Sequence, residues 1–219
     1  MKNTIIVEGK DDVSFFTKLL GEKFFKGDND DKNEVIPTGG FPNMINFEEI
    51  IKRSEFENAD NLIFICDADE SYVKRKKQLE GLISKIVKNY PGKTAFYYIL
   101  PFNKEEDEID VTTNKIKQAG SLENLILEVI EQEKEEKFLK IKNCAEGFFK
   151  CVEEVKTKQS KSKLIIQAIL SASAPNDDPS YSISKVLEGN LNYLSNDNQK
   201  FFQNELLQNL KNSILKLLK

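Results

Sequence analysis

The chain has 219 residues, of which 39% are hydrophobic and 31% are charged, and its formal net charge is −4. This composition predicts a globular cytoplasmic protein, because no apolar run approaches the roughly 20 residues that span a bilayer. The chain contains no histidine, which excludes Ser-His-Asp triads, Cys-His pairs and histidine-ligated metals. Oxygen ligands would therefore have to hold any metal, and they favour Mg²⁺ or Mn²⁺.

The first half of the chain alternates predicted strands with predicted helices. In chain order, the expected elements are a strand at 3–7, a helix at 11–20, a loop at 22–33, a strand at 34–37, a turn at 38–43, a helix at 43–53, a buried strand at 62–66, a helix at 71–89 and a strand at 94–100. Asp11 or Asp12 can cap the first helix, and Val87 is expected on the apolar side of the helix at 71–89. Alternating strands and helices predict an α/β fold with a mostly parallel sheet flanked by helices.

The second half of the chain is predicted to be helical. In order, we expect a charged loop at 102–115, helices between 121 and 157, a helix at 161–172, a break at 173–180 and a helix at 198–218. Ser121 is a plausible N-cap for the first of these helices. The predicted domains are therefore an α/β domain at 1–110 and a helical extension at 111–219.

Three cysteines are present, an odd number without C-x-x-C spacing, which argues against a disulfide framework and a zinc knuckle. Cys66 lies in a predicted strand and is expected to be a buried small hydrophobe. Cys144 and Cys151 are seven residues apart, which places them on one helix face and predicts that they belong to the core.

Carboxylates follow two of the predicted strands. Glu8 comes directly after the first strand, and Asp67 and Asp69 follow the strand at 62–66. The carboxyl ends of parallel strands share one edge of a sheet, where ligands bind. A Mg²⁺ ion needs only one or two protein carboxylates in addition to phosphate oxygens. The alternative is structural: Glu8 and Asp12 cap the first helix, and the two aspartates form a polar turn.

A strand followed by VEGKDD and a helix, and a later strand followed by DAD, resemble the TOPRIM domain of topoisomerases, primases and related nucleases. The resemblance covers roughly residues 3–100 and implies a Rossmannoid sheet. It implies that Glu8 is an acid/base or metal contact and that Asp67 and Asp69 bind metal. The glycine that often follows this motif is missing from DADESYV.

Among TOPRIM proteins, the closest resemblance is to small stand-alone bacterial proteins of unknown function. A weaker one is to the nuclease domain of the overcoming-lysogenization-defect family, in which a serine-x-glutamate and a downstream lysine join the acids. By that resemblance Ser121, Glu123 and Lys163 (or Lys161) are further candidates. The chain has no GxxxxGK[ST] motif, so any ATPase would be a separately encoded partner.

These observations lead to the hypothesis of a Mg²⁺- or Mn²⁺-dependent phosphodiesterase, most simply a nuclease acting on DNA or RNA. The candidate catalytic residues are Glu8 and Lys163, the candidate metal ligands are Glu8, Asp67, Asp69 and Glu123, and the candidate nucleic-acid contacts are Lys10, Lys74, Arg75, Lys76 and Lys77. Two alternatives stay open: a non-catalytic nucleic-acid-binding or partner-binding protein, with phage defence as one setting, and an α/β protein whose acids are incidental. The basic runs at 72–78 and 156–163 are equally compatible with solvated surfaces. The sequence does not indicate an oligomeric state.

Overall fold

The computed structural model describes residues 1–26, 32–69, 71–101, 109–110, 115–116, 120–133, 136–151, 161–173 and 201–218. The chain forms two compact units, one made of Met1–Leu122 with Asn209–Lys219 and the other of Glu123–Gln208. The sequence placed the boundary near residue 110, whereas the structure places it after Leu122 and returns the last residues to the first unit. Most of the predicted loop at 102–115, the basic residues 156–160 and the predicted break at 174–180 lie outside the described residues.

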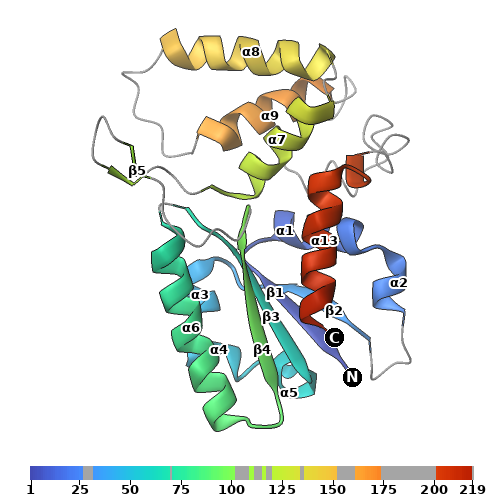
Figure 1. The fold of residues 1–219 in the computed structure, drawn as a ribbon, viewed down its shortest axis with the longest axis vertical. Helices are drawn as coiled ribbons and strands as arrows, with labels where there is room; N and C mark the ends of the chain where they lie inside the picture. Colours follow the sequence, from blue (N-terminus) through green and yellow to red (C-terminus); the bar gives the residue numbers. More distant parts are fainter. Residues whose placement is uncertain are drawn as a thin grey trace. The chain divides into compact units, whose positions relative to one another are not determined.

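The first unit is built on a four-stranded sheet in which all strands are parallel, as predicted (Figure 1). Its strands are β1 (Asn3–Val7), β2 (Glu34–Pro37), β3 (Asn61–Asp67) and β4 (Thr94–Leu100), in the order β2-β1-β3-β4. The register aligns Ile5 of β1 with Val35 and Ile63, and Asp67 with Leu100. The side chains of β3 are buried from Asn61 to Cys66, as expected of a central strand that is covered on both faces.

Helices cover both faces of this sheet. α1 (Lys10–Leu20) connects β1 to β2, and α6 (Tyr72–Asn89) connects β3 to β4. The two connections run in opposite directions across the sheet, so right-handed crossovers place α1 and α6 on opposite faces. Leu79, Leu82 and Ile86 of α6 join Phe64 and Cys66 in one buried cluster.

Three sequence predictions about the helices of this unit are wrong. The single helix expected at 43–53 is three short helices, α3 (Phe41–Met44), α4 (Phe47–Ile50) and α5 (Ser54–Asn58), because the backbone becomes extended at Asn46 and Arg53. Val87 is 46% exposed rather than buried, since α6 presents a narrower apolar face than its sequence suggested. The predicted loop at 22–33 also contains a short helix, α2 (Glu22–Phe25).

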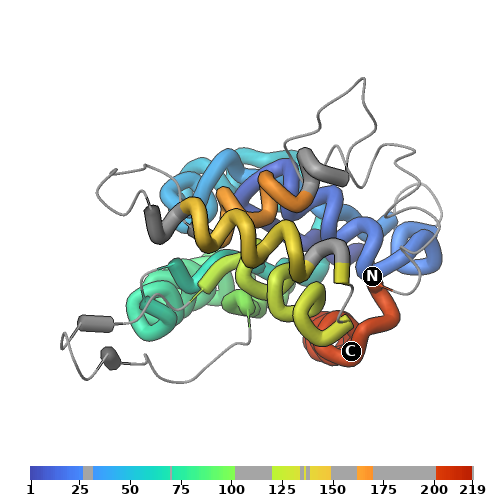
Figure 2. Tube along the Cα trace, turned by 90° about the horizontal axis from the view of Figure 1, so that it is seen from above, coloured from blue at the N-terminus to red at the C-terminus, as the bar shows by residue number. Residues whose placement is uncertain are grey.

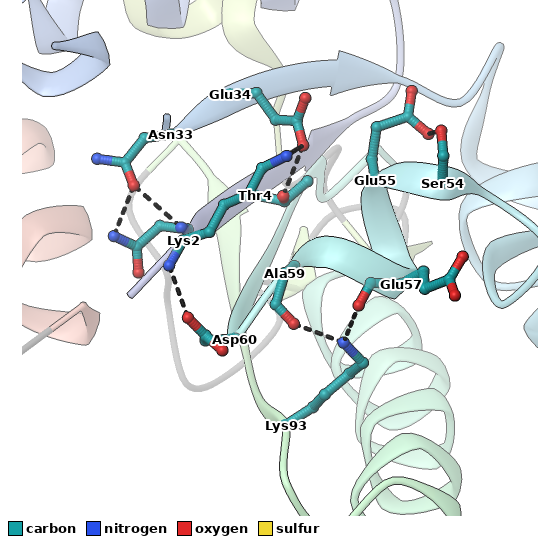
Figure 3. Close-up of polar contacts among 11 residues, drawn as sticks. Lys2, Thr4, Asn33, Glu34, Ser54, Glu55, Glu57, Ala59, Asp60 and Lys93 are labelled. Atoms are coloured by element: carbon teal, nitrogen blue, oxygen red, sulfur yellow. Dashed lines mark hydrogen bonds and ion pairs between the residues drawn. The ribbon is translucent and has the colours of Figure 1, made fainter. Parts of the chain in front are cut away.

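Polar contacts tie the amino ends of the strands together (Figure 3). The backbone N–H of Lys2 donates to Asp60 Oδ2 at 2.7 Å, and the Lys2 ammonium pairs with Glu34 Oε1 at 3.0 Å. Lys93 Nζ donates to the carbonyl oxygen of Glu57 at 2.9 Å. This network lies at the edge opposite to Glu8 and Asp67, so it fixes the sheet without using the carboxylates of the candidate site.

The C-terminal half is helical, as predicted. Its described elements are a two-stranded antiparallel pair, β5 (Ile109–Asp110) and β6 (Lys115–Ile116), followed by α7 (Leu122–Glu133), α8 (Glu136–Cys151), α9 (Lys161–Ser173) and α13 (Glu205–Leu217). In the second unit, α8 and α9 pack side by side (Figure 2). Cys144 of α8 is exposed, which contradicts its predicted place in the core because it lies on the side of α8 turned to solvent. The side chain of Cys151 lies outside the described set.

Within the described chain, no helix is both long enough and apolar enough to cross a membrane.

Candidate metal and phosphate site at the carboxyl edge of the sheet

The strand order reverses between β1 and β3. After β1 the chain steps outward to β2, and it then returns to the other side of β1 to form β3. At such a switch point, the two neighbouring connections leave the sheet toward opposite faces, and their divergence opens a crevice where ligands bind. Glu8 directly follows β1, and Asp67 is the last residue of β3. Both predicted acids therefore stand at the point of the sheet that topology marks for a ligand.

The side chain of Glu8 reaches across to β3. Its Oε1 accepts a hydrogen bond from the backbone N–H of Asp67 at 3.0 Å. An aspartate carboxylate oxygen lies at most about 5 Å from its own amide nitrogen, so the carboxylates of Glu8 and Asp67 approach within about 8 Å. The structure thus brings together two acids that are 59 positions apart in the chain.

A glycine pair after β2 supports Glu8 from the other side. The backbone N–H groups of Gly39 and Gly40 both donate to the carbonyl oxygen of Glu8 at 2.9 Å. The φ angles of Gly39 and Gly40 are +79° and +118°, a region that L side chains rarely adopt. The backbone of Phe41, the next residue, also hydrogen-bonds to the Glu8 carboxylate. Glu8 is therefore held by backbone groups from two neighbouring connections.

The protonation of Glu8 depends on these surroundings. Burial raises the pKa of Glu8, since desolvation disfavours a charged carboxylate. The hydrogen bond from the backbone of Asp67 opposes this rise in the pKa, and so does the positive charge of Arg75, while the negative charge of Asp69 adds to it. The net rise in the pKa means that Glu8 holds a proton more readily than a glutamate in solution does.

Asp67 has a structural partner of its own. Its Oδ1 accepts a hydrogen bond from the backbone N–H of Leu122, the first residue of α7, at 2.9 Å. Negative charge at a helix N-terminus is favourable because the first N–H groups of a helix have no partner within it. Asp67 therefore anchors the start of α7 to the end of β3.

Asp69 occupies a left-handed backbone position with a φ angle of +50°. This conformation is tolerated by aspartate better than by most residues. The backbone of Asp69 forms a bridge with Gly120, whose carbonyl oxygen accepts the Asp69 N–H at 3.0 Å. The chain therefore leaves β3 through an aspartate in the left-handed position.

Arg75 completes the cluster. One of its terminal guanidinium nitrogens forms an ion pair with Asp69 Oδ2. The guanidinium carbon lies 3.6 Å from the centroid of the Phe41 ring, a cation–π stack that fixes the plane of the fork. The Arg75 side chain is only 18% exposed. Arg75 was predicted to contact nucleic acid together with the neighbouring lysines, and the structure places it beside Asp69; its contact with nucleic acid stays a prediction.

Cys66 lies beneath this cluster in β3 and is buried, as predicted. Burial raises the pKa of its thiol well above the usual value, and the carboxylates of Glu8 and Asp67 raise it further. The thiol is therefore neutral and unreactive.

The lysines of the first unit that were predicted to contact nucleic acid lie in the first turns of two helices. Lys10 is the exposed first residue of α1, while Lys74 and Lys77 are exposed and Lys76 half-buried in the first turns of α6. Ser71 caps α6 by accepting a hydrogen bond from the backbone N–H of Lys74 at 3.1 Å.

The cap of α1 is provided by Asp12. Its Oδ2 accepts a hydrogen bond from the backbone N–H of Gly9 at 2.8 Å. This arrangement follows the capping alternative for Asp12, whereas the carboxylate of Glu8 turns toward β3.

Glu123 and Lys163 belong to the second unit. Glu123 is half-buried in the first turn of α7, and Lys163 is exposed on α9. The adjacent residues Asn124 and Ser162 share a hydrogen bond of 2.8 Å that ties these two helices together. The roles expected for Glu123 and Lys163 stay predictions.

The donor chemistry of the edge suits a hard divalent cation. Glu8, Asp67 and Asp69 supply carboxylate oxygens, the ligands that Mg²⁺ and Mn²⁺ prefer. Among the described residues, no three acidic, cysteine or histidine side chains are already arranged as a metal cage. Magnesium sites often use one or two carboxylates and complete their coordination with water and substrate phosphate, so the residues fit such an ion in their chemistry.

Sequence reasoning did not identify the support that Phe41, Gly39 and Gly40 give to this site. The signal was present in TGGF, since two consecutive glycines directly after a strand indicate backbone with positive φ and a close approach.

Residues 2–217 match the family described as a protein of unknown function, DUF3226, and the chain belongs to that family. The match includes both compact units, so the helical half is part of the family's common architecture. No curated protein and no solved structure matches the chain.

Proposed function

We propose that the protein is a Mg²⁺- or Mn²⁺-dependent phosphodiesterase of the TOPRIM type that acts on nucleic acid. The observation that carries the proposal is the meeting of Glu8 with Asp67 at the switch point between β1 and β3, with Asp69 adding its negative charge to the same site. A parallel sheet that delivers several carboxylates to one crevice supplies the oxygen ligands that phosphoryl chemistry with divalent ions requires.

Each residue at this edge would have a separate role in the reaction. Asp67 and Asp69 would hold the ion, which when bound polarises a phosphodiester and helps to generate a nucleophile from water. Glu8, whose pKa is raised by burial, would accept or return a proton beside them. The exposed Lys10, Lys74 and Lys77 would contact the flanking phosphates of the nucleic acid. Glu123 and Lys163 remain candidates for a second metal ligand and a phosphate contact.

A second candidate function is a non-catalytic module that binds nucleic acid or a partner, including a separately encoded ATPase. The hydrogen bonds of the acids themselves favour it: Asp67 accepts the first N–H of α7 and Asp69 pairs with Arg75. Acids that already have protein partners can serve the fold alone.

Mn²⁺ binding followed by incubation with nucleic acid separates the two functions. The variants are wild type, Glu8→Gln and the double variant Asp67→Asn with Asp69→Asn. The control is Glu49→Gln, which changes an exposed carboxylate on α4. At a hundredfold excess over Kd, Mn²⁺ should stabilise wild type and the control by about 2.7 kcal/mol, and it should not stabilise the double variant.

Labelled DNA and RNA are then incubated with each protein and Mn²⁺. Cleavage by wild type that is lost in Glu8→Gln supports the phosphodiesterase. Binding of nucleic acid without cleavage supports the second candidate. No stabilisation of wild type by Mn²⁺, or equal stabilisation of the double variant, contradicts the metal site.

A further inference from the structure

Arg75 differs from the other basic residues near the candidate site in how it is held. Lys74 and Lys77 on the same helix are exposed, whereas the Arg75 side chain is 18% exposed and its guanidinium carbon lies over the Phe41 ring. Ordering a long side chain in this way costs conformational entropy that a solvated surface cation would not give up. The ion pair with Asp69 and the contact with Phe41 offset this cost and hold Arg75 inside the cluster rather than in solvent.

The hydrogen bonds of Arg75 leave capacity for a ligand. A guanidinium carries five N–H donors, and within the described part of the chain its side-chain hydrogen bond goes to Asp69. No guanidinium nitrogen of Arg75 is among the buried side-chain atoms of that part that lack a hydrogen bond, and the side chain keeps 18% of its surface exposed. An incoming acceptor can therefore be bound without leaving a buried donor unpaired.

The charges around Arg75 indicate what that acceptor is. Its positive charge acts on Glu8 and on the thiol of Cys66, so it lies within electrostatic reach of the whole cluster. A divalent ion at Asp69 would compete with the Asp69–Arg75 pair, because both cations seek the same carboxylate. The planar fork of an arginine matches the oxygens of a phosphate and binds them in pairs.

We propose that Arg75 is the phosphodiester-binding residue of this site and that its ion pair with Asp69 is the resting position of the metal-free protein. The proposal rests on the proposed function. When a divalent ion occupies the carboxylates, Asp69 releases the guanidinium, and the Phe41 stack keeps the fork aimed at the edge of the sheet, where a phosphate lies beside the ion. Arg75 thereby couples metal binding to substrate binding.

The test measures two affinities that should change in opposite directions in Arg75→Gln. Mn²⁺ alone is titrated by calorimetry, and a fluorescein-labelled phosphorothioate oligodeoxynucleotide is titrated by anisotropy in the presence of Mn²⁺. Arg75→Gln should bind Mn²⁺ roughly tenfold more tightly, because a positive charge and a competitor for Asp69 are removed. The same variant should bind the oligonucleotide at least about tenfold more weakly, because the charged fork is lost.

Two further variants keep the test decisive. Arg75→Lys keeps the charge without the planar fork, so its Mn²⁺ affinity should stay near that of wild type while its oligonucleotide affinity falls. Lys77→Gln removes an exposed charge two residues along the same helix, and it should leave Mn²⁺ binding unchanged and weaken the oligonucleotide less than about threefold. Melting in EDTA verifies that each variant is folded.

The outcomes separate this proposal from the proposed function. If wild type binds Mn²⁺ but Arg75→Gln binds it no more tightly, or loses no more oligonucleotide affinity than Lys77→Gln, the role of Arg75 is overturned and the metal site stands. If wild type binds no Mn²⁺, the metal site and the role of Arg75 are both overturned.

Discussion

The hydrogen bonds of Glu8 allow its structural contribution to be separated from its charge. Glu8→Ala removes the acceptor for the backbone N–H groups of Asp67 and Phe41, and a buried donor without a partner costs about 1–3 kcal/mol. Glu8 is half-buried, so water replaces part of this loss, and the removal of a desolvated charge offsets some of the rest. We therefore expect Glu8→Ala to lower the free energy of unfolding by about 2 kcal/mol at pH 7.

Glu8→Gln should behave differently. The amide oxygen still accepts from both backbone donors, although hydrogen bonds to a neutral acceptor are weaker than those to a carboxylate. In return, the variant loses the burial cost of a charge and the repulsion from Asp69, the two effects that raise the pKa of Glu8. Its free energy of unfolding should lie within about 1 kcal/mol of wild type at pH 7.

The pH dependence gives an independent measurement of the same effect. Because the pKa of Glu8 is raised above its ordinary value of 4.5 in the folded state, the folded protein holds this proton more tightly than the unfolded chain. The contribution of Glu8 to stability is then greatest below pH 4.5 and is lost as the pH rises through the folded pKa. Relative to Glu8→Gln, wild type should gain stability as the pH falls from 7 to 4.5.

Urea denaturation of the three proteins in EDTA, at a series of pH values, measures both effects. The reasoning is refuted if Glu8→Gln is as unstable as Glu8→Ala, since charge rather than an acceptor would then be required. It is also refuted if wild type loses stability relative to Glu8→Gln on acidification, because the folded pKa would then be lowered.

The remaining predictions concern the exits of β3 and the start of α6, and all are measured by denaturation without metal. Asp67→Asn should keep the hydrogen bond to Leu122 and change stability little, whereas Asp67→Ala should cost about 1 kcal/mol; equal losses in the two variants would show that the charge of Asp67, and not its hydrogen-bond acceptor, stabilises the start of α7. Asp69→Ala should cost about 1–2 kcal/mol because alanine is strained at a φ of +50° and the pair with Arg75 is lost. Asp69→Gly should lose less stability, because glycine is not strained there. A larger loss in Asp69→Gly than in Asp69→Ala would show that backbone strain does not cause the loss. Ser71→Ala should cost about 1 kcal/mol through loss of the α6 cap, and an unchanged free energy of unfolding would contradict this.

The strands and their order along the chain could be predicted because a strand that is buried on both faces has an unbroken apolar sequence. The run from Leu62 to Cys66 has no polar residue, as expected of a central parallel strand in a covered sheet. The same reasoning placed Glu8 and Asp67 at one edge, because parallel strands align their carboxyl ends. The sequence was therefore sufficient to predict a parallel sheet and the acids that meet at its carboxyl edge.

The partners of those acids could not be read from the sequence. The contact between Arg75 and Phe41 joins residues from different connections, and no local periodicity encodes it. The carboxylate of Asp67 meets Leu122 across 55 positions, after a segment that a charged composition identified only as a loop. The helix expected at 43–53 failed for a related reason: apolar spacing indicated a helix, while the extended backbone at Asn46 and Arg53 divides it.

Structural and ligand roles of the acids at this edge are compatible, because a carboxylate offers about four acceptor positions on two oxygens. Glu8 uses Oε1 for the N–H of Asp67, and Asp67 uses Oδ1 for the N–H of Leu122. These bonds orient the carboxylates before any ion arrives, which lowers the entropy that ion binding must remove. An amide replaces the structural bond but is a poor ligand for a hard cation. Asparagine and alanine substitutions at the same position therefore separate the two roles: a purely structural acid loses nothing with asparagine, whereas a ligand loses its metal with either.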